Sequence, residues 1–220
     1  MKYLTPFLVS ACLVLTVPVA ADAAQSRKAS DGHDRIVGNN NPNKLRGLPG
    51  NDTIFGLGGN DRLEGNPGRD EIWGGDGNDI IFGNAGVDLL HGDAGDDSLN
   101  GGPGNDQIWG GIGNDIIRGF LDDDVIYGED GNDLINGEKG NDVIFGGPGD
   151  DWDPTKLERH GSLFGGPGND RVYGEDGNDH VVGGLDNDVV DGGTGDDVLD
   201  GWAGDDILID GPGNDNITGD

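Results

Sequence analysis

The sequence predicts an all-β fold, a solenoid in which short strands stack coil upon coil. Three observations lead to this prediction. Glycine accounts for 46 of 220 residues, which is roughly three times the usual share of about 7%, and it opposes helix interiors by about 1 kcal/mol per residue. Aspartate recurs at every ninth position along most of the chain. An isoleucine, leucine or valine stands two positions after nearly every one of these aspartates.

The chain opens with a segment unlike anything that follows it. Met1-Lys2 gives a positive start, Leu4–Val17 is mostly apolar, and the small residues Val19-Ala20-Ala21 suit a cleavage site. This pattern is typical of a secretory signal peptide, which we assign to residues 1–21, with a short linker at 22–31. The only cysteine, Cys12, lies inside the signal segment. We therefore expect a secreted, extracellular protein with no disulfide and no transmembrane span in the mature chain.

The nine-residue period runs from residue 32 to residue 220, and the unit at 74–82 reads GGDGNDIIF. Its glycines allow the turn to adopt positive φ and let the backbone approach closely. Three residues then form a strand, and the middle aliphatic points to one side because side chains alternate along a strand. A single unit cannot bury this aliphatic residue alone, so the units must stack.

Two units make one coil with a strand on each side, which places residues 18 apart in sequence side by side at roughly 4.8 Å. One inner wall is predicted to consist of Ile54, Ile72, Leu90, Ile108, Ile126 and Ile144. The opposite wall is predicted to consist of Leu63, Ile81, Leu99, Ile117 and Ile135.

Stacking also brings the repeated aspartates together, and their carboxylates would repel one another if left bare. Ca²⁺ resolves this repulsion, because it accepts several carboxylate and carbonyl oxygens, whereas Mg²⁺ demands stricter geometry and Zn²⁺ prefers Cys and His. Counting aspartates 18 apart gives 15 candidate pairs. The predicted metal ligands are Asp34, Asp52, Asp61, Asp70, Asp79, Asp88, Asp97, Asp106, Asp115, Asp124, Asp133, Asp142, Asp151, Asp170, Asp179, Asp188, Asp197, Asp206 and Asp215.

The unit resembles the RTX (repeat-in-toxin, haemolysin-type) calcium-binding nonapeptide repeat, whose signature is G-G-x-G-x-D-x-U-x. The resemblance covers residues 32–220. It implies a parallel β-roll with two nine-residue units per coil and Ca²⁺ bound at multiple sites in the turns. Folding is then expected to depend on calcium, because a site that exists only in the folded chain converts binding energy into folding energy.

Some units depart from the pattern. Asp122 and Asp186 replace turn glycines and Asn43 replaces a ligand aspartate, so we expect weaker metal binding in those turns. An irregular unit near 152–164 breaks both the glycine pattern and the phase. We interpret it as a bulge or loop, which is either a tolerated degenerate repeat or a recognition loop.

The residue after each inward aliphatic forms a row along the outside of the roll. One face is predicted to carry Val37, Phe55, Trp73, His91, Trp109, Tyr127, Phe145 and Phe164. Two interpretations are open for this aromatic ladder. The rings stack between neighbouring coils, or they form a docking stripe for a carbohydrate or a cell-surface protein.

Composition and motifs exclude other function classes. The formal charge of −30 speaks against nucleic acid as a partner, since phosphate contacts need clustered Lys and Arg. H-E-x-x-H and G-x-S-x-G do not occur, so we expect no enzyme, no catalytic residues and no organic cofactor. We predict a calcium-binding structural or binding module. The alternative is an extracellular adhesin or surface-layer component that binds glycan or a cell-surface partner, and a toxin or an enzyme-accessory module ranks below both.

Overall fold

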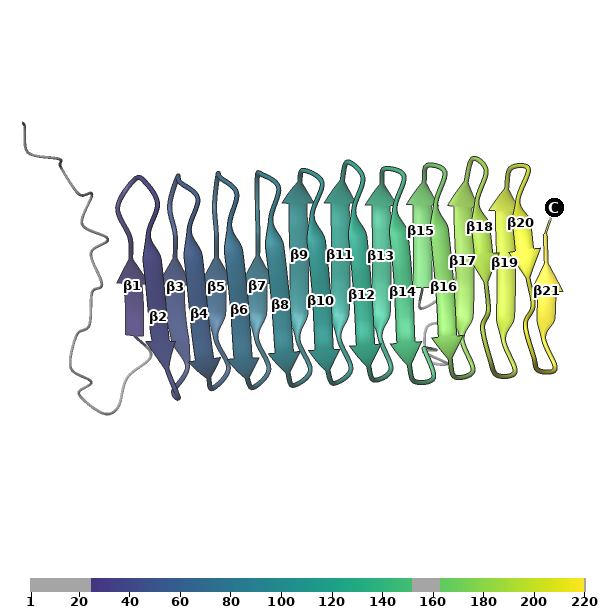
Figure 1. Ribbon diagram of the computed structural model, residues 1–220, viewed down its shortest axis with the longest axis horizontal. Helices are drawn as coiled ribbons and strands as arrows, with labels where there is room; N and C mark the ends of the chain where they lie inside the picture. The colour runs from purple at the N-terminus through teal and green to yellow at the C-terminus, as the bar shows by residue number, and fades with distance from the viewer. Residues whose placement is uncertain (1–24, 152–162, 220) are drawn as a thin grey trace, which may run out of the picture.

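The computed structural model describes residues 25–151 and 163–219, and these form two parallel sheets along one elongated roll (Figure 1). We call the sheets the odd sheet and the even sheet. The odd sheet contains β1 (Gln25–Lys28), β3 (Asn43–Arg46), β5 (Arg62–Glu64), β7 (Ile80–Phe82), β9 (Ser98–Pro103), β11 (Ile116–Leu121), β13 (Leu134–Lys139), β15 (Leu163–Pro167), β17 (His180–Leu185), β19 (Val198–Ala203) and β21 (Asn216–Thr218). The even sheet contains β2 (Arg35–Asn39), β4 (Thr53–Gly58), β6 (Glu71–Asp76), β8 (Leu89–Ala94), β10 (Gln107–Ile112), β12 (Val125–Asp130), β14 (Val143–Pro148), β16 (Arg171–Asp176), β18 (Val189–Asp191) and β20 (Ile207–Ile209).

The chain alternates between the sheets, so each strand pairs in parallel with the strand one coil later. Ile72 of β6 lies between Ile54 of β4 and Leu90 of β8, which is the predicted 18-residue register. The described residues form no helix, and none of them belongs to a helix long and apolar enough to cross a membrane. The all-β parallel roll predicted from the sequence is confirmed.

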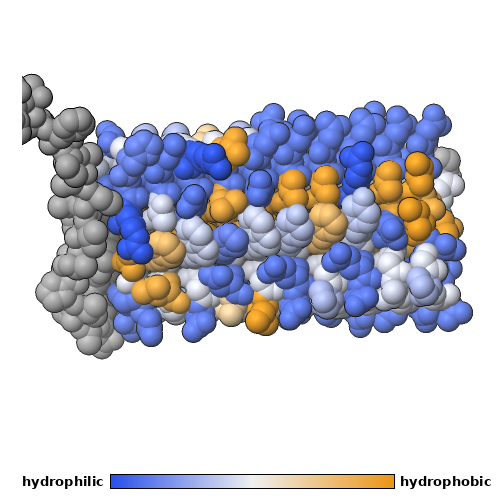
Figure 2. All heavy atoms as spheres, viewed as in Figure 1, coloured by the Kyte–Doolittle hydropathy of each residue, from blue (hydrophilic) through white to orange (hydrophobic). Residues whose placement is uncertain are grey.

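The core is a double column of aliphatic side chains between the sheets. Both predicted walls are confirmed, since all eleven of their members are at most 1% exposed. One column runs from Ile36 to Val190 and the other from Leu45 to Leu199. Outside, Figure 2 shows hydrophilic residues in a band along the turns of one edge and hydrophobic residues interspersed on the sheet beside it.

The register changes once, at the irregular segment. Ile135 pairs with Leu163 and Val143 pairs with Arg171, both 28 residues apart, ten more than one coil. The additional residues belong to 152–162, outside the described part of the chain, and the coils on either side stack as if they were absent. The predicted recognition loop therefore stays an expectation.

Two predicted placements differ from the structure. The insertion moves Phe164 to the odd sheet, where it pairs with Asn136, and Tyr173 takes the place next to Phe145 that was predicted for Phe164. The roll also begins before residue 32, because β1 pairs with β3 and lies within the residues assigned to the linker. The nine-residue period predicted neither the position of Phe164 nor the start of the roll at β1. The predicted signal peptide lies outside the described residues.

Candidate metal centre

Each repeat aspartate other than Asp151 is the last residue of a turn, and the next strand begins directly after it. Burial is nearly complete along the roll, since sixteen of these side chains are at most 2% exposed. They are Asp52, Asp61, Asp70, Asp79, Asp88, Asp97, Asp106, Asp115, Asp124, Asp133, Asp142, Asp151, Asp170, Asp179, Asp188 and Asp197. Buried carboxylates are rare unless they are paired or bind a metal, so this array requires a partner for its charge.

The carboxylates form two ladders, one along each edge of the roll. Within a ladder, the backbone N–H of each residue donates to Oδ1 of the next member at 2.6–3.0 Å. The first ladder is Asp34, Asp52, Asp70, Asp88, Asp106, Asp124, Asp142, Asp170, Asp188 and Asp206. The second is Asn43, Asp61, Asp79, Asp97, Asp115, Asp133, Asp151, Asp179, Asp197 and Asp215.

The second carboxylate oxygen is where the ladders are incomplete. Oδ2 of every one of the sixteen buried aspartates is buried and accepts no hydrogen bond. An unsatisfied buried acceptor typically costs about 1–3 kcal/mol, and more when it is charged. Sixteen such atoms in register indicate ligands for a cation.

The proton affinity of these groups reflects the same problem. Burial raises the pKa of Asp70 to about 7 and that of Asp106 to about 8. The N–H bond to Oδ1 lowers the pKa of Asp70, while the carboxylates of Asp88 and Asp52 raise it further. The ionised ladder is therefore unfavourable near neutral pH unless positive charge lies among the carboxylates.

Glycine five residues before each aspartate makes room for that unpaired oxygen. A Cβ placed on Gly65 would clash with Oδ2 of Asp70 and with the backbone carbonyl oxygen of Gly83 in the next coil. Gly110 stands in the same relation to Asp115 and Gly128. A carboxylate oxygen and a main-chain carbonyl oxygen thus adjoin the same space in fourteen of the sixteen turns, and oxygen ligands of these kinds are those that Ca²⁺ prefers.

The predicted ligands divide into three groups. The sixteen buried aspartates have the unpaired Oδ2 atoms. Asp206 and Asp215, in the last coil, are half-buried and still accept ladder hydrogen bonds through Oδ1. Asp34 is half-buried, and its Oδ2 is bonded by Ser30 at 2.9 Å.

Sequence counting missed two ladder contacts. The backbone N–H of Asp142 donates to Oδ1 of Asp170, and that of Asp151 donates to Oδ1 of Asp179, each across 28 residues. They raise the number of neighbouring aspartate pairs to 17. In residues 25–151 and 163–219, no three His, Cys, Asp or Glu side chains converge on one point. The further protein ligands that these turns offer are main-chain carbonyl oxygens.

The aromatic row on the even sheet is a continuous stack. Neighbouring centroids lie 4.5–5.5 Å apart with interplanar angles of 4–12°. The rings belong to Phe55, Trp73, His91, Trp109, Tyr127, Phe145 and Tyr173. The interior rings have both faces covered by their neighbours, and the Arg35 guanidinium lies 4.8 Å from the Phe55 centroid. This geometry favours coil-to-coil packing, because a sugar stacks on an exposed ring face.

A parallel solenoid whose turns carry buried, unpaired carboxylate oxygens is a calcium-binding repeat protein of the β-roll class. The RTX calcium-binding nonapeptide repeat profile matches residues 29–63, 55–90, 82–117, 118–153, 160–190 and 182–217. The chain belongs to this family, which confirms the resemblance drawn from its sequence. Comparison with curated proteins gave no match.

Proposed function

We propose that the chain is a secreted module that folds when Ca²⁺ enters its two ladders and then serves as a rigid structural or binding element outside the cell. The single observation that carries this proposal is the set of sixteen unpaired Oδ2 atoms. Fourteen of them adjoin a main-chain carbonyl oxygen of the next coil, and calcium supplies positive charge to such oxygens without demanding octahedral geometry. Family repeats are calcium-binding structural elements, which agrees with this role.

Secretion is supported by the physics of the site and by the pattern of residues 1–21. Extracellular modules bind Ca²⁺ with dissociation constants of about 10⁻⁴–10⁻³ M, far above cytosolic concentrations. A chain with 43 acidic and 13 basic residues would repel itself inside the cell and stay unfolded until it meets calcium. The predicted division is therefore a signal peptide at 1–21 and a functional roll after it.

The ligands we assign are the ladder aspartates, with the backbone carbonyls of the turns completing each site. The chain's own contribution is to hold each Oδ1 through a backbone N–H, which fixes the carboxylate plane and leaves Oδ2 free. Glycine at the facing position keeps side chains out of the turn. The bound ion would neutralise the ladder and so stabilise the stacked coils.

The test is a calcium titration followed by far-UV circular dichroism and isothermal titration calorimetry. We expect a β signal that appears with Ca²⁺, is lost in EGTA and is not restored by Mg²⁺ alone. Asp106→Asn should lower the number of ions bound, while Asp130→Asn, which changes an exposed carboxylate outside the ladders, should leave it unchanged. A full β signal in EGTA, or equal stoichiometry in both variants, would contradict the proposal.

A further inference from the structure

We propose that the first coil of the two ladders, residues 30–46, is closed by protein donors in place of calcium and is the nucleus from which the later coils fold. This inference rests on the proposed function, since it concerns which coils need the metal. Both ladders begin in this coil, at Asp34 and at Asn43. Each of these residues makes hydrogen bonds that the sixteen buried aspartates lack.

Asp34 begins the first ladder, and the chain itself supplies donors to its Oδ2. Ser30 donates to Oδ2 twice, from its backbone N–H and from its hydroxyl, each at 2.9 Å. In the following coil the equivalent atom, Oδ2 of Asp52, is buried and unpaired. A hydroxyl and an amide thus stand where later turns have no donor, and the Asp34 turn is held without an ion.

Asn43 begins the second ladder with an amide in place of a carboxylate. Its Oδ1 accepts the N–H of Asn39 at 2.8 Å, and its Nδ2 donates to the carbonyl oxygen of Asn41. Gly38 makes room for Oδ1 as the other glycines do for Oδ2, since a Cβ there would clash with that atom. Asn43 is therefore 4% exposed with both polar atoms satisfied. An N–H donor does in this turn what a cation must do in the others.

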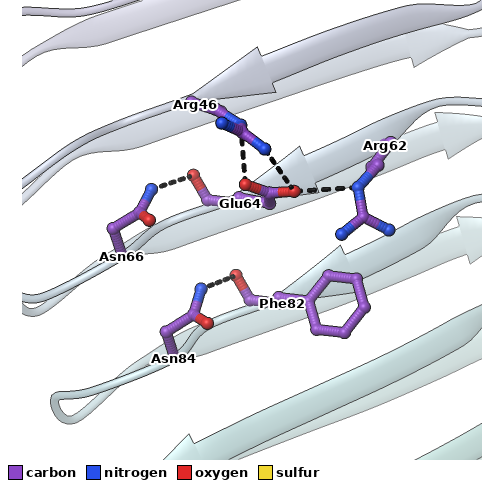
Figure 3. Close-up of polar contacts among 6 residues, drawn as sticks. All are labelled: Arg46, Arg62, Glu64, Asn66, Phe82 and Asn84. Atoms are coloured by element: carbon purple, nitrogen blue, oxygen red, sulfur yellow. Dashed lines mark hydrogen bonds and ion pairs between the residues drawn. The ribbon is translucent and has the colours of Figure 1, made fainter.

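The surrounding coils also balance their own charge. Residues 25–69 contain seven basic and five acidic residues, whereas residues 172–220 contain fourteen acidic residues and no Lys or Arg. Figure 3 shows Glu64 between two arginines, with Arg46 Nε at 2.7 Å and Arg62 Nε at 2.8 Å. Arg62 also lies 4.6 Å from the Phe82 centroid. Self-repulsion in the absence of calcium is thus least at this end of the roll.

Folding then has a direction. A coil can recruit calcium only when a neighbouring coil presents a second row of ligands, and the first coil presents its row without metal. Asp52 and Asp61, whose Oδ1 atoms already bind the N–H groups of Asp34 and Asn43, form the next layer. Strands from β6 onward should therefore acquire order in sequence as calcium is added, and the acidic last coils should order at the highest calcium concentration.

The experiment is hydrogen exchange with mass spectrometry on the chain from residue 22 onward, in EGTA and at stepped Ca²⁺ concentrations. In EGTA we expect slow exchange in β2–β5 and fast exchange in β16–β20. The double variant Ser30→Ala/Asn43→Asp removes the two side-chain donors, the Ser30 hydroxyl and Nδ2 of Asn43, and its β2–β5 amides should lose their protection in EGTA. Ser98→Ala/Asn105→Asp, at two exposed positions with the same change in charge, is the matched control and should retain it.

The outcomes separate the two proposals. Protection along the whole wild-type roll in EGTA would overturn the calcium-dependent function and this inference together. Uniformly fast exchange in EGTA with recovery in Ca²⁺ would overturn the inference alone, as would recovery that starts at β16–β20. Equal loss of protection in both double variants would assign the effect to added charge and also contradict the role of Ser30 and Asn43.

Discussion

The two ends of the roll share one backbone design and differ in what holds it together. Near the N-terminal end, Ile54 is fully buried and Asp52 accepts the N–H of Asp34. Near the C-terminal end, Val190 is equally buried and Asp188 accepts the N–H of Asp170. The first region has two arginines around Glu64, whereas residues 172–220 contain no Lys or Arg at all.

This difference separates shape from stability. Period and aliphatic burial give both regions the same coil, because a parallel ladder in 18-residue register has one way to bury its column. What each coil requires from solution depends on charges and donors that lie outside the nine-residue consensus. A repeat protein of this kind is close to a sum of coil terms and neighbour terms, so its ends can differ in their dependence on metal.

Calcium removal should give the largest effect and the sharpest contrast between the ends. We expect EGTA to expose the chain beyond β16 to protease while β2–β5 resist, because the C-terminal carboxylates then have no counter-charge. Limited proteolysis with mass mapping of the cut sites measures this directly. Digestion in excess Mg²⁺ serves as the control and should resemble EGTA, and a cut pattern spread evenly along the roll would show that the ends do not differ.

Acid should replace calcium, and the sign follows from the raised pKa values. Burial raises the pKa of Asp97 and of Asp151 to about 8, and that of Asp188 to about 7, from the ordinary aspartate value of 3.8. A carboxyl whose folded pKa lies above its unfolded pKa adds stability at low pH and loses it as pH rises through the folded value. In metal-free buffer the roll should therefore become more stable as the pH is lowered from 8 to 4.

Circular dichroism across that pH range, with and without Ca²⁺, checks this expectation. In calcium the dependence should reverse, since protons compete with the ion for the same oxygens. Hydrogen exchange resolves the two ends, and the gain in amide protection on acidification should be larger in peptides from β16–β20 than in those from β2–β5. A metal-free chain that is equally unfolded at both ends of the pH range would refute the role assigned to the unpaired Oδ2 atoms.

Much of this architecture could be predicted from the sequence, because its period is strict. Ile72, Leu90 and Ile108 fall 18 apart, and pleat alternation alone places them on one inner wall. The placement of Phe164 failed, because the insertion has no period of its own and the row passes to Tyr173. The sequence predicted the ladder aspartates as metal ligands, but it did not predict that their two carboxylate oxygens would have different partners. Oδ1 binds a backbone N–H and Oδ2 binds nothing, which depends on side-chain rotation within a turn.

The features specific to this chain were the hardest to predict. β1 contains neither the aspartate nor the glycine of the repeat, so the nine-residue period did not predict this strand. Ser30 and Asn39 are unremarkable polar residues in a linear sequence, and their value comes from folding back onto Asp34 and Asn43. Short-range donor geometry of this kind has no periodic signature.

Single ladder substitutions should have effects of opposite sign with and without metal. Asp188→Asn can keep the Oδ1 acceptor and replaces the unpaired, charged oxygen with a neutral N–H donor. We expect a lower Tm in excess Ca²⁺, through loss of a ligand, and a higher Tm in metal-free buffer, each by about 1–3 kcal/mol in unfolding free energy. Asp52→Asn is the counterpart near the basic end, and its metal-free gain should be smaller. Calorimetric unfolding of both variants decides this, and equal gains would remove the contrast between the ends.

The smallest expected effect lies in the ion-pair cluster of the N-terminal end. The Glu64 side chain is 11% exposed, whereas those of Arg46 and Arg62 are 43% and 41% exposed, so the centre is desolvated and the arginines reach water. Glu64→Gln should destabilise β3–β7 by about 1–2 kcal/mol, between the values for exposed and buried pairs. Urea unfolding of the calcium-loaded chain measures the loss, with Glu129→Gln, an exposed acid in the middle of the roll, as the control. Because Glu64 pairs with two arginines, the Glu64→Gln substitution should also reduce the hydrogen-exchange protection of β2–β5 in EGTA. If that protection is unchanged, the metal-free stability of β2–β5 comes from the hydrogen bonds of Ser30 and Asn43 alone.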